Sequence, residues 1–133
     1  MLKVKKILIL ILIASLSICV AACESVEKEM PNFNRIDSNT AKEMMDSGQE
    51  LIIVDVRTDV EYESGHVVGA INIPVEQITS GDFGSLTDKS KTILIYCRSG
   101  NRSRTASRFL AENGYENIYD FGGIIDWKYE IEY

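Results

Sequence analysis

One cysteine in the chain has surroundings that favour nucleophilic chemistry. Cys97 follows an uninterrupted apolar run, Ile93 to Tyr96, which is typical of a strand buried on both faces in a parallel sheet. A glycine-containing loop with two arginines, Arg98 and Arg102, comes next, and a helix is expected to begin near Arg102. A strand, a tight loop and a helix N-terminus together present backbone N–H groups to an anion. The same helix dipole and the two arginines favour thiolate over thiol at Cys97.

The other cysteines leave few roles for Cys97. Cys19 lies in an N-terminal apolar segment that is expected to be removed as a signal, and Cys23 follows this segment at a position where its sulfur is expected to carry a lipid. Cys97 is then the one free thiol expected in the mature domain. A disulfide then has no second sulfur, and a thioredoxin-like cycle has no resolving cysteine. A single histidine, His66, and scattered carboxylates show no metal-ligand spacing, so we expect no metal and no organic cofactor. A nucleophile and an inert buried thiol remain as alternatives.

The loop after Cys97 favours the nucleophile. Ser99, Gly100 and Asn101 are residue types that allow a tight turn with N–H groups pointing inward. Arginines on both sides of such a turn can form charge-assisted hydrogen bonds with an anion.

Residues 1–22 are predicted to be an export signal rather than part of the fold. A start with three lysines precedes an uncharged run of fourteen residues, Ile7 to Val20, and then two alanines. The run is shorter than the ~20 residues of a membrane-spanning helix. The segment V20-A-A-C23 resembles the lipobox of bacterial lipoproteins, in which the cysteine is lipidated and becomes the first mature residue. An ordinary secretory signal and an uncleaved anchor are the alternatives, and all three place the domain outside the cytoplasm.

The charge balance argues against nucleic-acid binding. The first 22 residues carry three of the 14 basic residues and none of the 20 acidic ones, so the rest of the chain has a formal charge of −9. Residues 23–32 are polar without periodicity and are expected to be a flexible tether between a lipid anchor at Cys23 and the domain. The domain is expected to span residues 33–133.

Strand and helix signals alternate through this domain. Asp37 or Ser38 can cap a first helix, and Thr58 and Glu61 have the spacing of a capping box. Near-continuous apolar strands between helices predict an α/β fold with a parallel sheet. We expect helices after Ser38, after Thr58 and over 102–113, strands at 51–56, 70–73, 92–96 and 118–121, a helical turn carrying Trp127, and an acidic surface tail at 129–133.

Three segments resemble the rhodanese-like sulfurtransferases. C97-R-S-G-N-R-S103 resembles the active-site loop of that family, and the stretch from Asp55 to Pro74 resembles its other hallmark. G122-G-I-I-D-W127 resembles its C-terminal end. The likeness covers about residues 33–133, with the motifs in the family's order. It implies the rhodanese-like α/β fold, a central five-stranded parallel sheet flanked by helices, and a cysteine that carries a sulfane sulfur as a persulfide.

The resemblance also implies roles for individual residues. Cys97 would carry the persulfide, and Asp55 and Arg57 would brace the loop. The implied partners are a small anionic sulfur donor such as thiosulfate and a thiophilic acceptor such as cyanide or a thiol, and we expect a monomer. Residues implied to cradle the sulfur or hold the donor are Arg98, Ser99, Gly100, Asn101, Arg102 and Ser103.

Loop length separates sulfur transfer from phosphate chemistry. Cysteine-dependent phosphatases place an arginine at the sixth position after the cysteine, whereas here Arg102 is the fifth and Ser103 the sixth. Tyr96 stands where such phosphatases usually have histidine. The alternative to an enzyme is a non-catalytic sulfur carrier or partner-binding module of the same family. We expect His66 to form structural hydrogen bonds and Trp127 to be a packing residue in the core or at its edge.

Overall fold

The computed structural model describes residues 32–133. The predicted signal peptide, Cys23 and all but the last residue of the predicted tether lie outside the described residues. Within the described part no helix is long and apolar enough to span a membrane.

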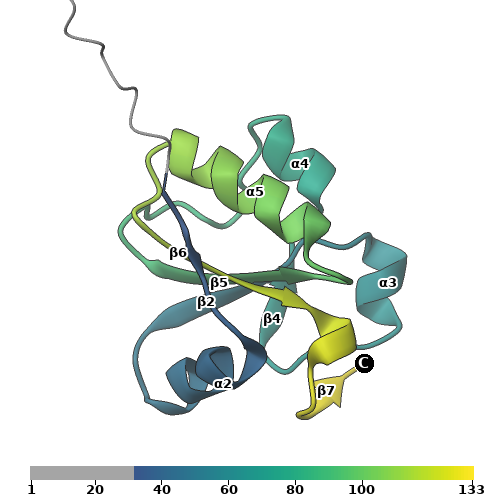
Figure 1. Ribbon diagram of the computed structural model, residues 1–133. Helices are drawn as coiled ribbons and strands as arrows, with labels where there is room; N and C mark the ends of the chain where they lie inside the picture. Colours follow the sequence, from purple (N-terminus) through teal and green to yellow (C-terminus); the bar gives the residue numbers. More distant parts are fainter. Residues whose placement is uncertain (1–31) are drawn as a thin grey trace, which may run out of the picture.

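Five strands form a parallel sheet in the order β1-β6-β5-β2-β4, and every pairing within it is parallel. Figure 1 shows α4 and α5 on one face of this sheet and α2 on the other. The predicted α/β architecture, a five-stranded parallel sheet flanked by helices, is confirmed. The elements are β1 (Asn34–Arg35), α2 (Ser38–Asp46), β2 (Leu51–Asp55), α3 (Asp59–Glu63), β3 (His66–Val67), β4 (Ala70–Asn72), α4 (Val75–Thr79), β5 (Thr92–Cys97), α5 (Asn101–Glu112), β6 (Asn117–Gly123), the 3-10 turn η1 (Ile124–Asp126) and β7 (Ile131–Glu132).

Strand β5 runs through the middle of the sheet, and its side chains alternate between two cores. Ile93, Ile95 and Cys97 belong to the cluster that includes residues of α4 and α5. Leu94 and Tyr96 belong to the cluster that includes Ala41 of α2 and Phe121 of β6. Because successive side chains of a strand point to opposite faces, Cys97 faces the α5 side and Tyr96 faces the α2 side.

The predicted helix caps are present. The Asp37 side chain accepts a hydrogen bond from the backbone N–H of Thr40 at the start of α2. Thr58 and Glu61 form the capping box of α3, in which each side chain accepts a hydrogen bond from the other residue's backbone N–H.

Three strands of two residues, β1, β3 and β7, were not predicted. Asn34 and Arg35 pair with Tyr119 and Asp120, so the domain begins with an edge strand. The tail at 129–133 is exposed, as expected, but part of it also forms β7, which pairs antiparallel with β3. Strands of two residues carry no usable hydrophobic period, which is why the sequence pattern did not predict these three.

Candidate active site

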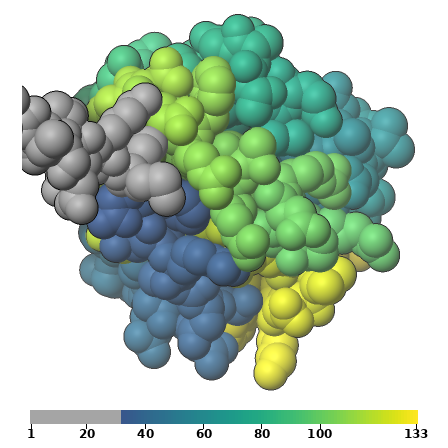
Figure 2. All heavy atoms as spheres, turned by 45° about the horizontal axis from the view of Figure 1, so that its top comes forward, coloured from purple at the N-terminus to yellow at the C-terminus, as the bar shows by residue number. Residues whose placement is uncertain are grey.

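Cys97 ends β5 at an irregularity in the sheet. Between Ile95 and Cys97 the register with β6 shifts, because Ile95 pairs with Asp120 while Cys97 pairs with Gly123. The extra residue lies in β6, so the bulge bends β6 where its two glycines lie near the loop after Cys97. The Cys97 thiol is 1% exposed and lies below the N-terminus of α5. In Figure 2 the green atoms of α5 and its preceding loop cross the face between the teal atoms of α4 and the yellow C-terminal segment.

The loop between β5 and α5 wraps closely around the sulfur. The Gly100 N–H donates a hydrogen bond to Cys97 Sγ at 3.0 Å, and Ser103 Oγ lies 3.7 Å from the same sulfur. Gly100 caps α5 with φ +100°, a conformation that side chains rarely adopt. The loop thus brings a helix N-terminus and an N–H group to the nucleophile predicted from the sequence.

Two glycines of β6 allow the loop to approach the sheet. A Cβ atom on Gly123 would lie 2.2 Å from the carbonyl oxygen of Arg98. Gly100 approaches the other glycine, since a Cβ atom on Gly100 would lie 3.5 Å from the Cα of Gly122. The Ile125 N–H donates to the Arg98 carbonyl at 3.3 Å and ties the loop to η1. Gly123 is therefore a steric requirement of this loop, whereas Gly122, where an added Cβ would meet no atom within 4 Å, is favoured by its φ of +87°.

The electrostatics of the loop favour ionisation of Cys97. Burial by itself raises the pKa of the thiol. Hydrogen bonds from the backbone N–H groups of Ser103 and Gly100 act in the opposite direction and stabilise the thiolate, and the pKa of Cys97 is lowered from its ordinary value.

The arginines of the loop have different surroundings. Arg98 is exposed and forms no ion pair with the described residues. Arg102 donates to both carboxylate oxygens of Glu61, at 2.7 and 2.9 Å. This contact lowers the pKa of Glu61 to about 2. The side chain expected to hold an anionic donor is thus already bound to an anion of the protein itself. Ser99 and Asn101 are exposed beside it.

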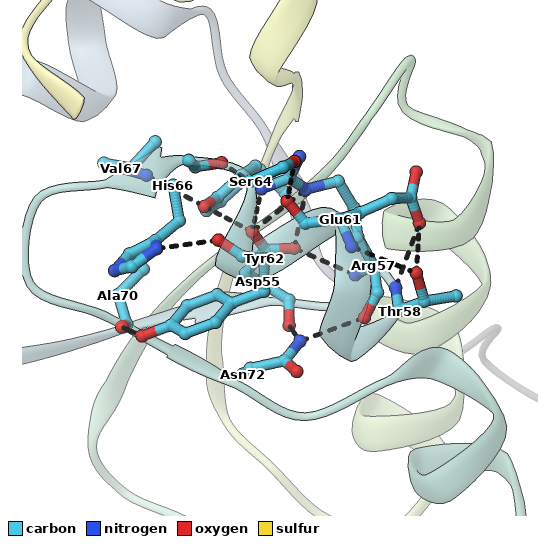
Figure 3. Close-up of polar contacts among 12 residues, drawn as sticks. Asp55, Arg57, Thr58, Glu61, Tyr62, Ser64, His66, Val67, Ala70 and Asn72 are labelled. Carbon is cyan, nitrogen blue, oxygen red and sulfur yellow. Dashed lines mark hydrogen bonds and ion pairs between the residues drawn. The ribbon is translucent and has the colours of Figure 1, made fainter. Parts of the chain in front are cut away.

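Asp55 and Arg57 support the strand that precedes the loop. Arg57 Nη2 donates to Asp55 Oδ2 at 2.6 Å and to the carbonyl of Gly65 at 2.8 Å (Figure 3). The hydroxyl of Tyr96 donates to the same Asp55 oxygen at 2.6 Å and accepts from the N–H of Val67 at 3.0 Å. Burial and this bond to Asp55 raise the pKa of Tyr96. Asp55 and Arg57 were expected to brace the loop after Cys97. Their contacts are instead with Tyr96, one residue before Cys97, and with the turn at Gly65.

Both ring nitrogens of His66 contact groups other than the Cys97 sulfur. Its Nδ1 lies 2.9 Å from the carbonyl oxygen of Tyr62, and its ring stacks on the Tyr62 ring at 3.7 Å (Figure 3). Its Nε2 lies 3.5 Å from a carboxylate oxygen of Glu132 in β7. These contacts fit the structural role expected for the only histidine.

A cavity of about 790 Å³ lies elsewhere, between α2 and the C-terminal segment. Trp127 and Tyr129 line it together with Lys42 and Leu51, and no residue from Cys97 to Ser103 takes part. We place the candidate site at Cys97, because a buried thiol under a helix N-terminus has defined chemistry. The cavity has a large volume, but none of the described residues that line it is a comparable nucleophile.

The family model of the Rhodanese-like domain matches residues 37–130. This match covers more than two thirds of the chain and includes Cys97 and both flanking motifs. The chain belongs to the rhodanese-like domain family.

Members of the rhodanese-like family from other organisms share the fold and much of the sequence. Thiosulfate sulfurtransferase PspE of Escherichia coli K12 is 37% identical over 73 residues, 55% of this chain and 70% of that protein. A sulfurtransferase of Allochromatium vinosum is 34% identical over 95 residues, 71% of this chain and 87% of that one. A solved rhodanese with anions from E. coli is 32% identical with a TM-score of 0.57, covering 62% of this chain and 98% of that chain. These relatives support sulfur transfer at the level of the family.

Sequence reasoning missed several contacts of this rhodanese-like site. It did not pair Glu61 with Arg102, and it gave Tyr96 no bonding role. It also passed over Asp120 of β6, whose Oδ1 accepts a hydrogen bond from the Ser103 hydroxyl at 2.7 Å. A signal for Asp120 was present, since a charged residue within an apolar strand has to be satisfied when buried, as Asp55 is in β2.

Proposed function

We propose that this protein is a sulfurtransferase that moves a sulfane sulfur from thiosulfate or a similar donor to a thiophilic acceptor through a persulfide on Cys97. The observation that carries the proposal is the position of the Cys97 sulfur, 3.0 Å from the Gly100 N–H at the N-terminus of α5. The family's sulfurtransferases support the reaction class, and the name of PspE supports thiosulfate as the donor.

The first step is a displacement at the outer sulfur of the donor. The Cys97 thiolate attacks that sulfur, an S–S bond to Cys97 forms, and the bond from the outer sulfur to the sulfonate breaks with its electron pair. Sulfite leaves as a dianion, and the persulfide retains one negative charge. The N–H groups at the start of α5 stabilise this charge. The exposed guanidinium of Arg98 in this loop supports a role in binding the donor's sulfonate.

The second step returns the site to its starting state. A thiophilic acceptor attacks the outer sulfur of the persulfide, and the Cys97 thiolate leaves. Cyanide would give thiocyanate, and a thiol would give a new persulfide. Each step consumes and releases anions and requires neither a base nor an oxidant.

The dimensions of the loop support sulfur rather than phosphate as the group in the cradle. Strand β5 ends at Cys97 and α5 begins at Asn101, so only three residues connect them. Arg102 lies in the first turn of α5 and is bound by Glu61 rather than open to a phosphate.

Turnover with thiosulfate and cyanide tests the proposal against a non-catalytic carrier. The full chain in detergent should release thiocyanate over many cycles, and Cys97→Ser should release none while keeping its unfolding transition. A single sulfur bound without turnover would indicate the carrier instead.

We further propose that a lipid on Cys23 anchors the domain outside the cytoplasm. The lipobox-like segment V20-A-A-C23 after a basic and then apolar stretch supports this. In a bacterial host, the chain should incorporate a labelled fatty acid and sediment with membranes, whereas Cys23→Ala should do neither. Incorporation of the label by the Cys23→Ala variant would contradict the anchor.

A further inference from the structure

The site buries one carboxylate that the proposed reaction does not use. Asp120 of β6 is 1% exposed, and its Oδ1 accepts hydrogen bonds from the Ser103 hydroxyl at 2.7 Å and from the Gly122 N–H at 3.0 Å. Its Oδ2 forms no hydrogen bond within the described residues, and the Nε of Arg35 lies 3.9 Å away. A buried, half-satisfied carboxylate is costly to keep. Its position one hydroxyl away from Cys97 suggests what it contributes.

The Ser103 hydroxyl lies between this carboxylate and the nucleophile. Its oxygen is 2.7 Å from Asp120 Oδ1 and 3.7 Å from Cys97 Sγ. A hydroxyl has a single hydrogen to donate and two lone pairs to accept with. The carbonyl oxygens of Gly100 and Gly122 lie farther from this hydroxyl, at 3.2 and 3.4 Å. The bond to the Asp120 carboxylate is the shortest and is charge-assisted, so Asp120 takes the hydrogen. Ser103 then faces Cys97 with a lone pair, which can accept from the S–H of a thiol but cannot donate to a thiolate.

We propose that Asp120 is a positioning residue that orients the Ser103 hydroxyl as an acceptor for the Cys97 S–H and so retains the proton on the resting nucleophile. The N–H groups of the loop favour the thiolate, and the Asp120–Ser103 pair opposes them. The inference rests on the proposed role of Cys97 as the nucleophile, and it gives Asp120 an effect on the fraction of Cys97 that is present as thiolate.

Other charged groups face this chain of contacts without replacing it. Arg35 of β1 faces Asp120, but its side chain is 58% exposed, so solvent screens it. Arg102 of α5 is paired with Glu61 of α3. Arg98 forms no hydrogen bond to Sγ. Within the described residues the donors that stabilise this sulfur as a thiolate are backbone N–H groups, chiefly those of Ser103 and Gly100. A change in the orientation of Ser103 should therefore register directly at Cys97.

The rate of iodoacetamide alkylation of Cys97 against pH measures this effect. The full chain is alkylated in detergent, and the Cys97 peptide is quantified by mass spectrometry. Asp120→Asn keeps the shape but replaces the charged acceptor with a neutral amide oxygen, so the Ser103 hydrogen is held less strongly and can turn to the thiolate, and the pKa of Cys97 should fall by about one unit. Below the pKa this is a roughly tenfold faster alkylation.

Ser103→Ala separates orientation from charge. In the wild-type background it should not raise the pKa of Cys97, because Ser103 does not donate to the thiolate there. In the Asp120→Asn background it should raise the pKa, because the released hydrogen is lost.

Three results would overturn the proposal. The first is an unchanged pKa of Cys97 in a folded Asp120→Asn variant, and the second is a raised pKa of Cys97 in Ser103→Ala alone. The third is a fall in the pKa of Cys97 on Asp120→Asn that is equal with and without the Ser103 hydroxyl, because Asp120 would then act by its charge only. If Asp120→Asn does not fold, the Ser103→Ala result decides by itself. Alkylation needs no sulfur donor, so failure here is distinguishable from failure of sulfur transfer.

Discussion

Glu61 holds the Arg102 guanidinium through both carboxylate oxygens, although 41 residues separate the two in sequence. The same carboxylate caps α3 through the Thr58 N–H. One side chain therefore fixes α3, the first turn of α5 and the charge beside Cys97. Arg102 is held in place, but its positive charge is largely compensated before a donor arrives.

Releasing Arg102 should strengthen the binding of anionic donors. Glu61→Gln keeps a capping side chain and removes the carboxylate. We expect the KM for thiosulfate to fall by up to about fivefold, the equivalent of ~1 kcal/mol for an exposed charge pair. Glu63→Gln, which neutralises an exposed carboxylate of the same helix, is the control and should leave KM unchanged. An unchanged or higher KM in Glu61→Gln would mean that Arg102 does not meet the donor.

The same ion pair should give a defined dependence of stability on pH. The pKa of Glu61 falls from 4.5 to about 2 in the folded chain, chiefly because of the hydrogen bonds from Arg102. A carboxyl group with a lowered folded pKa stabilises above its unfolded pKa and loses that contribution as pH falls through the folded value. The wild type should therefore melt slightly above Glu61→Gln from pH 5 upwards, and the difference should shrink between pH 4.5 and 2. A difference that stays constant across that range would contradict the assignment.

The buried pair beneath the loop should matter much more for stability than pairs on the surface. Asp55→Ala leaves Arg57 buried without its carboxylate and removes the acceptor of the Tyr96 hydroxyl. We expect a loss of roughly 3–5 kcal/mol in urea unfolding. Lys91→Ala, which breaks the exposed pair with Glu50, should cost far less, because solvent screens that pair. Equal losses in the two variants would refute the bracing role.

Gly123 should tolerate no side chain. Its backbone, with φ −129°, suits alanine, so the obstacle is the loop itself: an added Cβ atom would clash with the Arg98 carbonyl and with the Cα of Ser99. Gly123→Ala should displace the loop, abolish thiocyanate release and cost roughly 1–3 kcal/mol. In Gly81→Ala, where φ is +89° and no atom lies within 4 Å of the added Cβ, strain of ~1 kcal/mol should leave turnover intact. A fully active Gly123→Ala variant would show that the close approach is not required.

The sequence predicted those features that depend on neighbouring residues. The apolar run before Cys97 indicated a central buried strand, and the Thr58–Glu61 spacing predicted a capping box, because both follow from local periodicity. The alternation of strand and helix signals predicted the parallel sheet, and the family resemblance supplied its five strands and the identity of the loop. Each of these features was predicted from a short segment of sequence or from a motif.

Contacts between distant segments could not be read in that way. The pairing of Glu61 with Arg102 and of Asp120 with Ser103 depends on which strands become neighbours and on a register shift after Ile95. The same residue type can be a solvated cap, an ion-pair partner or a buried acceptor, and only the packing decides between them. Edge strands of two residues, such as β1, are formed by their partners rather than by their own pattern.

The central claim is that Cys97 carries the transferred sulfur, and mass spectrometry of the full chain before and after thiosulfate measures this most directly. The account predicts a gain of one sulfur atom on the peptide containing Cys97, its removal by cyanide as thiocyanate, repeated turnover, and no gain in Cys97→Ser. No sulfur on Cys97 after thiosulfate, or full thiocyanate release by Cys97→Ser, would contradict it.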